Sequence, residues 1–194
     1  DSVAGRQAFK SLLRDGQRPD TQRLALQLLA RGTKTPGERE LLRQDMAELL
    51  QNPAQRTIHE DLTLALAQSA LMDKLYPEAE QRARQLIELY PGSALKAAAL
   101  GVRLTVAWDL GRYRTAADLA GQLRAIVMDA RERAELGVLL AEAFFRSEDY
   151  KNAGDAYAAA LHELPAVVPA GTLIFQRVLA DIRADQLDSA ATPL

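Results

Sequence analysis

The feature of this sequence that most constrains its fold is an internal repeat with a period of 37 residues. A tyrosine recurs at that spacing, and three residues after each tyrosine stands an alanine: Tyr76 with Ala79, Tyr113 with Ala116, and Tyr150 with Ala153. A period of this length is typical of chains built by stacking one supersecondary unit many times. Three repeats are clear, a degenerate one precedes them, and a further one begins near the C-terminus.

The repeated unit is predicted to be helical. The 194-residue chain holds 35 alanines and 32 leucines, but only 13 valines and isoleucines together. Alanine and leucine favour helices, whereas β-branched residues favour strands, and no segment shows the alternation of a half-buried strand. Thr35-Pro36-Gly37-Glu38, and Asp129 with Glu132, are typical helix starts. Asn52-Pro53-Ala54-Gln55 is predicted to open one long helix that ends near Lys74. The sequence therefore predicts an all-α fold of ten to eleven helices.

The recurring residues resemble the tetratricopeptide repeat (TPR) family. The clearest repeat carries the residues Ala134, Leu140, Ala141, Phe144, Tyr150, Ala153, Tyr157, Ala160 and Pro165. The resemblance covers roughly residues 56–190 and implies an antiparallel helical-hairpin solenoid. The period is 37 rather than 34 residues, and the tryptophan expected early in each repeat is missing. We expect N-terminal helices with one degenerate repeat over 1–55, three TPR-like repeats over 56–168, and the start of another repeat over 169–194.

A weaker resemblance concerns the junction Leu89-Tyr90-Pro91-Gly92-Ser93. This junction is similar to the Tyr-Pro-x-Ser junction of bacterial envelope TPR proteins, which include the outer-membrane assembly lipoprotein and the Tol-associated periplasmic protein. The likeness implies a periplasmic location near the outer membrane, with the cytoplasm as the alternative.

The sequence lacks the residues that several classes of function require. The chain has no cysteine and a formal net charge of −2, so thiol chemistry is excluded and nucleic-acid binding is not expected. It has no glycine-rich phosphate loop and no apolar run long enough to span a membrane. Its two histidines, His59 and His162, lie in different repeats and are expected at the surface. We therefore expect no enzyme, no metal and no cofactor.

The TPR resemblance also implies which side chains line the inner, concave face of the repeats. The twelfth residue of each repeat is large and apolar: Leu71, Trp108, Phe145 and Ile182. Beside this stripe, the resemblance places Met72, Asp109, Arg146 and Arg183 at thirteenth positions, and Thr105 and Glu142 at ninth positions. One interpretation is a groove that takes a helix or an extended peptide. The alternative is that the twelfth residues are simply core.

The function predicted from these features is a non-catalytic scaffold or adaptor for protein–protein interaction. One alternative is a segment of a larger bacterial envelope protein that organises exopolysaccharide export or outer-membrane assembly, and another is an enzyme carried on a helical-repeat scaffold. Ile174, Val178 and Ile182 are expected to form an apolar face after Pro169, and Ala190 is expected to be the small packing residue of a second helix. Either further repeats follow, or this end self-associates or meets a partner.

Overall fold

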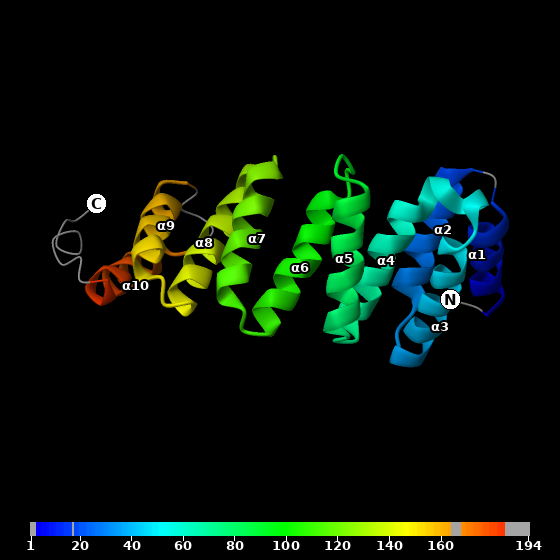
Figure 1. Ribbon diagram of the computed structural model, residues 1–194, viewed down its shortest axis with the longest axis horizontal. Helices are drawn as coiled ribbons and strands as arrows, with labels where there is room; N and C mark the ends of the chain where they lie inside the picture. The colour runs from blue at the N-terminus through cyan, green and yellow to red at the C-terminus, as the bar shows by residue number, and fades with distance from the viewer. Residues whose placement is uncertain (1–2, 17, 164–167, 185–194) are drawn as a thin grey trace. The chain divides into compact units, whose positions relative to one another are not determined.

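The computed structural model describes residues 3–16, 18–163 and 168–184, and these residues form helices without any strand (Figure 1). In chain order the elements are α1 (Val3–Asp15), α2 (Pro19–Gly32), α3 (Pro36–Leu50), the 3₁₀ helix η1 (Pro53–Ile58), α4 (His59–Met72), α5 (Tyr76–Leu89), α6 (Lys96–Asp109), α7 (Tyr113–Ile126), α8 (Ala130–Arg146), α9 (Tyr150–His162) and α10 (Ala170–Arg183). The all-α prediction is confirmed.

The chain divides into two compact units, residues 1–106 and 107–194, and α6 crosses the boundary between them. We describe each unit by itself. The predicted division into 1–55, 56–168 and 169–194 follows the repeats rather than compactness, and it stays a prediction.

The turn inside each hairpin follows the 37-residue period in its backbone conformation. Lys74, Gly111 and Glu148 have φ values of 57°, 68° and 63°, in the left-handed region. In each turn the next amide reaches back to the last turn of the preceding helix: Leu75 to the Ala70 carbonyl at 2.9 Å, Arg112 to Ala107 at 2.8 Å, and Asp149 to Phe144 at 3.0 Å. This is the Schellman closure, which satisfies carbonyls that a helix end leaves without partners.

The second helix of each hairpin begins at the repeated tyrosine and buries the repeated alanine. Ala79, Ala116 and Ala153 are each 0% exposed. In the first unit, Ala79 packs in a cluster that joins α4, α5 and α6, and in the second unit Ala153 packs with residues of α8 and α10. Because the alanine side chain is only a methyl group, it lets neighbouring helices pack closely at these positions. The register predicted from the sequence is therefore confirmed.

The start of the first unit shows one error in the sequence prediction. Residues 53–72 do not form one helix, because η1 precedes α4 as a separate 3₁₀ helix. The Asn52 side chain accepts from the Ala54 amide at 3.0 Å, so the predicted cap exists. Gln55, however, turns inward: its amide donates to the Arg14 carbonyl at 2.8 Å, and it accepts a hydrogen bond from the buried Gln22 at 2.5 Å. These hydrogen bonds connect η1 to α1 and α2, and they explain why η1 is separate from α4.

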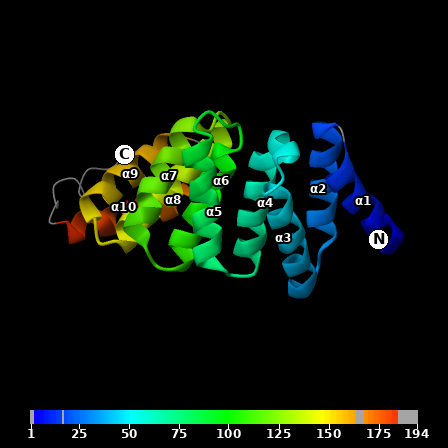
Figure 2. The same ribbon diagram turned by 45° about the vertical axis from the view of Figure 1, so that its right-hand side comes forward.

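The N-terminal helices of the first unit pack around an aliphatic core. α1 and α2 lie as a pair (Figure 2), and Leu13, Leu26, Met46 and Leu62 meet between α1, α2, α3 and α4. Lys10 and Arg14 of α1 pair with Asp45 of α3, both at 2.7 Å. The Thr35–Glu38 capping box at the start of α3 is present as predicted.

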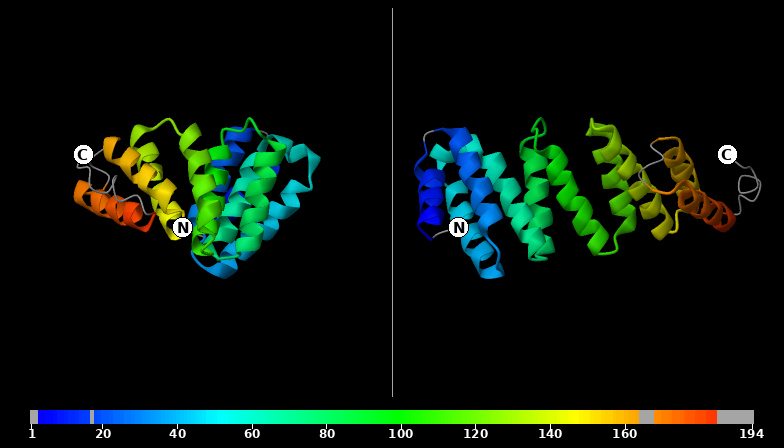
Figure 3. Two further views of the ribbon diagram at one scale, coloured as in Figure 1. Left: turned by 60° about the vertical axis from the view of Figure 1, so that its left-hand side comes forward. Right: turned by 180° about the vertical axis from the view of Figure 1, so that it is seen from behind.

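In the second unit, α8 packs against both α7 and α9, and α9 packs against α10 (Figure 3). The core centres on Tyr157, which is 1% exposed. Between α9 and α10, Asp181 is only 3% exposed and lies against Gly154, where a β-carbon would overlap its carboxylate. The expected packing residue Ala190 lies outside the described residues.

Candidate functional site

The predicted site residues of the first unit differ widely in their accessibility. Leu71 is half-buried against the core of α4, α5 and α6. Met72, the next residue, is 64% exposed. Thr105 is exposed on α6, and its hydroxyl donates to the Gly101 carbonyl at 3.0 Å. Met72 is therefore the one of the three that offers an apolar surface to a partner.

In the second unit, Trp108 and Arg146 come together although they belong to consecutive repeats. The Trp108 ring meets the ring of Tyr113 edge-on, with centroids 5.5 Å apart and planes at 79°. The guanidinium carbon of Arg146 lies 5.4 Å from the Trp108 centroid and 5.5 Å from the Tyr113 centroid. A cation held over two ring faces is an attractive arrangement that also fixes the arginine rotamer.

The same arrangement recurs one repeat later. Phe145 meets Tyr150 edge-on at 5.4 Å and 70°. The guanidinium of Arg183 lies 5.0 Å from the Phe145 centroid and 5.4 Å from the Tyr150 centroid. We call the two sets, Trp108–Tyr113–Arg146 and Phe145–Tyr150–Arg183, the arginine–aromatic stacks. In each stack the rings come from one repeat and the arginine from the next.

Glu142 is occupied by contacts within the second unit. Its carboxylate accepts from the Arg146 Nε at 2.7 Å and from the buried Tyr157 hydroxyl at 2.8 Å. Burial, reinforced by the Glu142 carboxylate, raises the pKa of Tyr157. The hydrogen bond that Arg146 donates to the Glu142 carboxylate raises the pKa of Arg146 further above its already high ordinary value. Glu142 therefore links the first stack to the core of the unit.

The second stack has no counterpart of Glu142. Four residues before Arg183 the chain has Leu179, where the first stack has its glutamate. In the part of the chain that the structure describes, no carboxylate forms an ion pair with Arg183, which remains exposed. Ile182, the predicted site residue beside it, is 48% exposed. The apolar face expected after Pro169 is present in part, because Ile174 is 43% exposed while Val178 is half-buried.

Sequence reasoning placed Trp108, Phe145 and Arg146 in the site and Arg183 at the matching position of the next repeat. It missed Tyr113 and Tyr150 as partners of these side chains. The signal was available, because each arginine follows its tyrosine by 33 residues in both stacks. The tyrosines were assigned only as markers of the repeat. Trp108 and Phe145 are both half-buried, so the choice between the groove interpretation and the core interpretation stays a prediction.

The two histidines lie apart from the stacks. His162 is the exposed last residue of α9, and His59 is half-buried at the start of α4. Within the described ranges no three potential metal-ligating side chains gather. Among those same residues, no helix has the length and apolar character needed to cross a bilayer.

Comparisons with known proteins support the fold. The sequence matches no family model, and no curated protein matches it significantly. A solved structure of MamA, a TPR-repeat protein, described as "MamA RS-1 ArsTM double mutant", is similar with a TM-score of 0.61 at 15% identity. The similarity covers 96% of this chain and 89% of that chain. The chain thus has a TPR-like, antiparallel helical-hairpin solenoid fold, whereas the envelope likeness and the periplasmic location stay predictions.

Proposed function

We propose that this protein is a non-catalytic scaffold that binds a protein or peptide partner, and that the arginine–aromatic stacks of the second unit are contact points. The observation that carries the proposal is that consecutive repeats present the same half-exposed combination of ring, tyrosine and arginine. Tryptophan, tyrosine and arginine are the residues most enriched among those that dominate binding energy at protein interfaces.

The stacks are prepared for binding because their arginines are already ordered. The Arg183 guanidinium rests on two rings, and its Nη1 lies 3.5 Å from the Tyr150 hydroxyl. An ordered side chain loses less conformational entropy when a partner arrives. Stacking leaves the guanidinium edge available for a carboxylate, and Arg183 has none among the described residues. The second stack is therefore the stronger candidate for an acidic contact.

Photo-crosslinking tests this function. A photoreactive amino acid at Ile182, which is 48% exposed beside Arg183, should crosslink to a partner in extracts of the source cells. A matched probe at Gln122, exposed on α7, should not give the same adduct. The partner is then purified, and its affinity for the wild-type chain is compared with that for a Trp108→Ala, Phe145→Ala double variant.

The expected result is an Ile182-specific adduct and an affinity at least tenfold weaker for the folded double variant. Equal adducts from both probe positions, or an unchanged affinity, would refute the role of the stacks. The remaining groove residues predicted from the sequence, which include Leu71, Met72 and Thr105, can be tested with the same partner.

A further inference from the structure

A hollow lies between α2 and α4 in the first unit, and its lining residues are not those of the arginine–aromatic stacks. It consists of two adjoining cavities, of about 240 and 80 Å³, which share the lining residues Ala30, Ala65 and Gln68. Ala30 projects from α2 and Ala65 from α4. The hollow exists because these facing side chains are methyl groups, which leave space between two helices that larger residues would fill.

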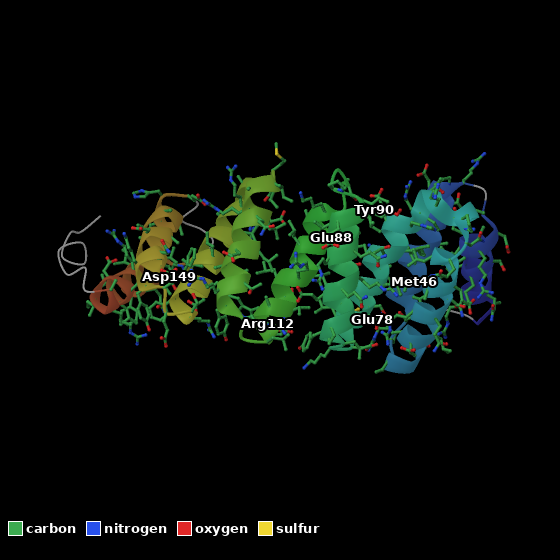
Figure 4. The ribbon with its side chains drawn as sticks, viewed as in Figure 1. Met46, Glu78, Glu88, Tyr90, Arg112 and Asp149 are labelled. Atoms are coloured by element: carbon green, nitrogen blue, oxygen red, sulfur yellow. The ribbon has the colours of Figure 1, made fainter. Side chains whose placement is uncertain are left out.

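The smaller cavity has an apolar lining. Leu42 and Met46 of α3 are 3% and 1% exposed, so the cavity reaches the core of the unit. Met46 is labelled in Figure 4. Met72, which is 64% exposed, is also part of the lining and is open to solvent. The cavity therefore connects a buried aliphatic surface with an exposed methionine.

Three polar side chains around the smaller cavity, those of Thr33, Arg39 and Ser69, are already hydrogen-bonded within the chain. The Thr33 hydroxyl donates to the Ala30 carbonyl at 2.9 Å. Arg39 donates from its Nε to Asp73 at 2.7 Å, and the Ser69 hydroxyl accepts from Arg43 at 3.1 Å. A charged side chain entering here would lose its hydration without gaining a counter-ion. The cavity therefore favours an uncharged, apolar group.

The two charged side chains that line the larger cavity pair with each other. Two side-chain amides in its lining have no hydrogen-bond partner among the described residues. Arg23 of α2 pairs with Asp61 of α4 at 3.0 Å. Gln27 on α2 is exposed in this cavity, and Gln68 is exposed on α4, where it lines both cavities. Neither glutamine side chain is hydrogen-bonded to another described residue. A primary amide both donates and accepts, so it can pair with a peptide main chain.

We propose that this hollow binds an uncharged peptide segment through one branched aliphatic side chain. The side chain enters the smaller cavity, and the main-chain amides that flank it pair with Gln27 and Gln68. The size favours a small side chain, because the smaller cavity has about 80 Å³, roughly half the volume of an apolar cavity of about 150 Å³ that binds benzene. The site goes beyond the proposed function of the stacks, because it uses other residues in the other unit.

Methionine-methyl NMR on the full chain provides a direct test. The chain has three methionines: Met46 and Met72 line the smaller cavity, and Met128, which is 93% exposed and lies in the second unit, serves as an internal control. The probe is N-acetyl-leucine methylamide, a single leucine with an amide on each side. We expect saturable shifts of the Met46 and Met72 methyl signals, no matching shift of Met128, and a dissociation constant of about 1–10 mM.

The specificity of the site is tested with related probes. The capped phenylalanine and the capped glutamate should each bind at least tenfold more weakly than the capped leucine. Equal binding of all three probes, a Met128 shift equal to the others, or no saturable shift of Met46 and Met72 would each overturn the proposal.

Two variants complete the test. Ala65→Leu fills the cavity and should abolish the saturable shifts, whereas Ala98→Leu, at an exposed position of α6, should leave them unchanged. If Ala65→Leu does not fold, a Gln27→Ala, Gln68→Ala double variant, changed only at exposed positions, should weaken binding at least threefold. Unchanged binding by a folded Ala65→Leu variant or by the glutamine variant would overturn the proposal. The outcome is independent of the crosslinking at Ile182, so failure of either proposal can be recognised separately.

Discussion

The guanidinium of Arg146 lies 5.4 Å from the centre of the Trp108 ring, although 38 positions separate the two residues in the chain. One repeat supplies the ring and the next supplies the cation. The contact therefore depends on the packing of one repeat against its neighbour, and it couples the exposed surface of the second unit to its stability.

The first prediction separates a binding role for the two rings from a core role. The Trp108→Ala, Phe145→Ala double variant should remain folded, with a loss of about 1–3 kcal/mol per site, because each site loses an edge-on ring pair and a cation–π contact. Fully buried aromatic residues would cost about 3–5 kcal/mol each. Urea unfolding followed by circular dichroism measures the difference, and a variant that unfolds without urea would show that both rings are core.

The second prediction concerns Ala153, a buried residue of α9 in the second unit. Ala153→Glu should cost several kcal/mol and unfold the α8–α9 hairpin, because Ala153 is 0% exposed and a glutamate there would be buried without a partner. The matched control is Ala159→Glu, at an exposed position of the same helix, which should change the melting temperature little. Equal melting temperatures for the two variants would contradict the register of this hairpin.

The third prediction uses the hairpin turns. Lys74→Gly and Glu148→Gly should each stabilise the protein by about 0.5–1 kcal/mol. A left-handed conformation costs a residue with a β-carbon about 1–2 kcal/mol, and the added freedom of glycine in the unfolded chain removes part of that gain.

Gly111→Ala should destabilise by about 1 kcal/mol for the same reason, since its φ is 68° and its surroundings leave room for a methyl group. Arg84→Gly, in the middle of α5 and exposed, is the matched control and should lose about 1 kcal/mol. Thermal and urea unfolding of the four variants gives the signs, and a destabilised Lys74→Gly variant would contradict the turn conformation.

The fourth prediction is a pH dependence at the start of α3. The Lys34 amide, the Arg6 guanidinium and the Thr35 amide bind the Glu38 carboxylate and lower its pKa from about 4.5 to about 2. Because the folded-state pKa is depressed, the stabilisation is fully present above pH 4.5 and disappears as the pH falls to about 2.

Glu38→Gln should therefore lower the urea midpoint at pH 7, and the difference from wild type should shrink steadily below pH 4.5. Glu88→Gln, which removes an exposed carboxylate from α5, is the matched control at pH 7. A Glu38→Gln difference that stays constant from pH 7 to pH 2 would show that the charge of Glu38 does not contribute.

The fold was largely predictable because its strongest constraints are local or periodic. The 37-residue spacing of Tyr76, Tyr113 and Tyr150 places the first residue of α5, α7 and α9 correctly. The division of residues 53–72 into η1 and α4 was not predictable in this way, because Gln55 accepts a hydrogen bond from the distant Gln22 and donates one to the Arg14 carbonyl. Local helix propensity contains no information about such partners.

The candidate site was predictable in part for the same reason. The size and spacing of Trp108 and Phe145 indicate a role in the site. The role of Arg183 depends on its contacts with the rings of the preceding repeat, which the sequence does not show. The hollow between α2 and α4 could not be predicted, because Ala30 and Ala65 indicate close packing in one geometry and a cavity in another.

The contact of Gly154 with the buried Asp181 bears on how such a chain can evolve. At the positions that correspond to Asp181 in the earlier repeats, the chain has Ala70, Ala107 and Phe144. Only the hairpin that carries Gly154 leaves space for the aspartate, since a β-carbon there would overlap the carboxylate. At the positions that correspond to Gly154 in the two earlier repeats, the chain has Ala117 and Glu80. If a single hairpin were duplicated or exchanged, the Asp181 carboxylate would meet one of these larger side chains. We therefore expect single hairpins of this chain to be less interchangeable at this contact than their shared 37-residue period suggests.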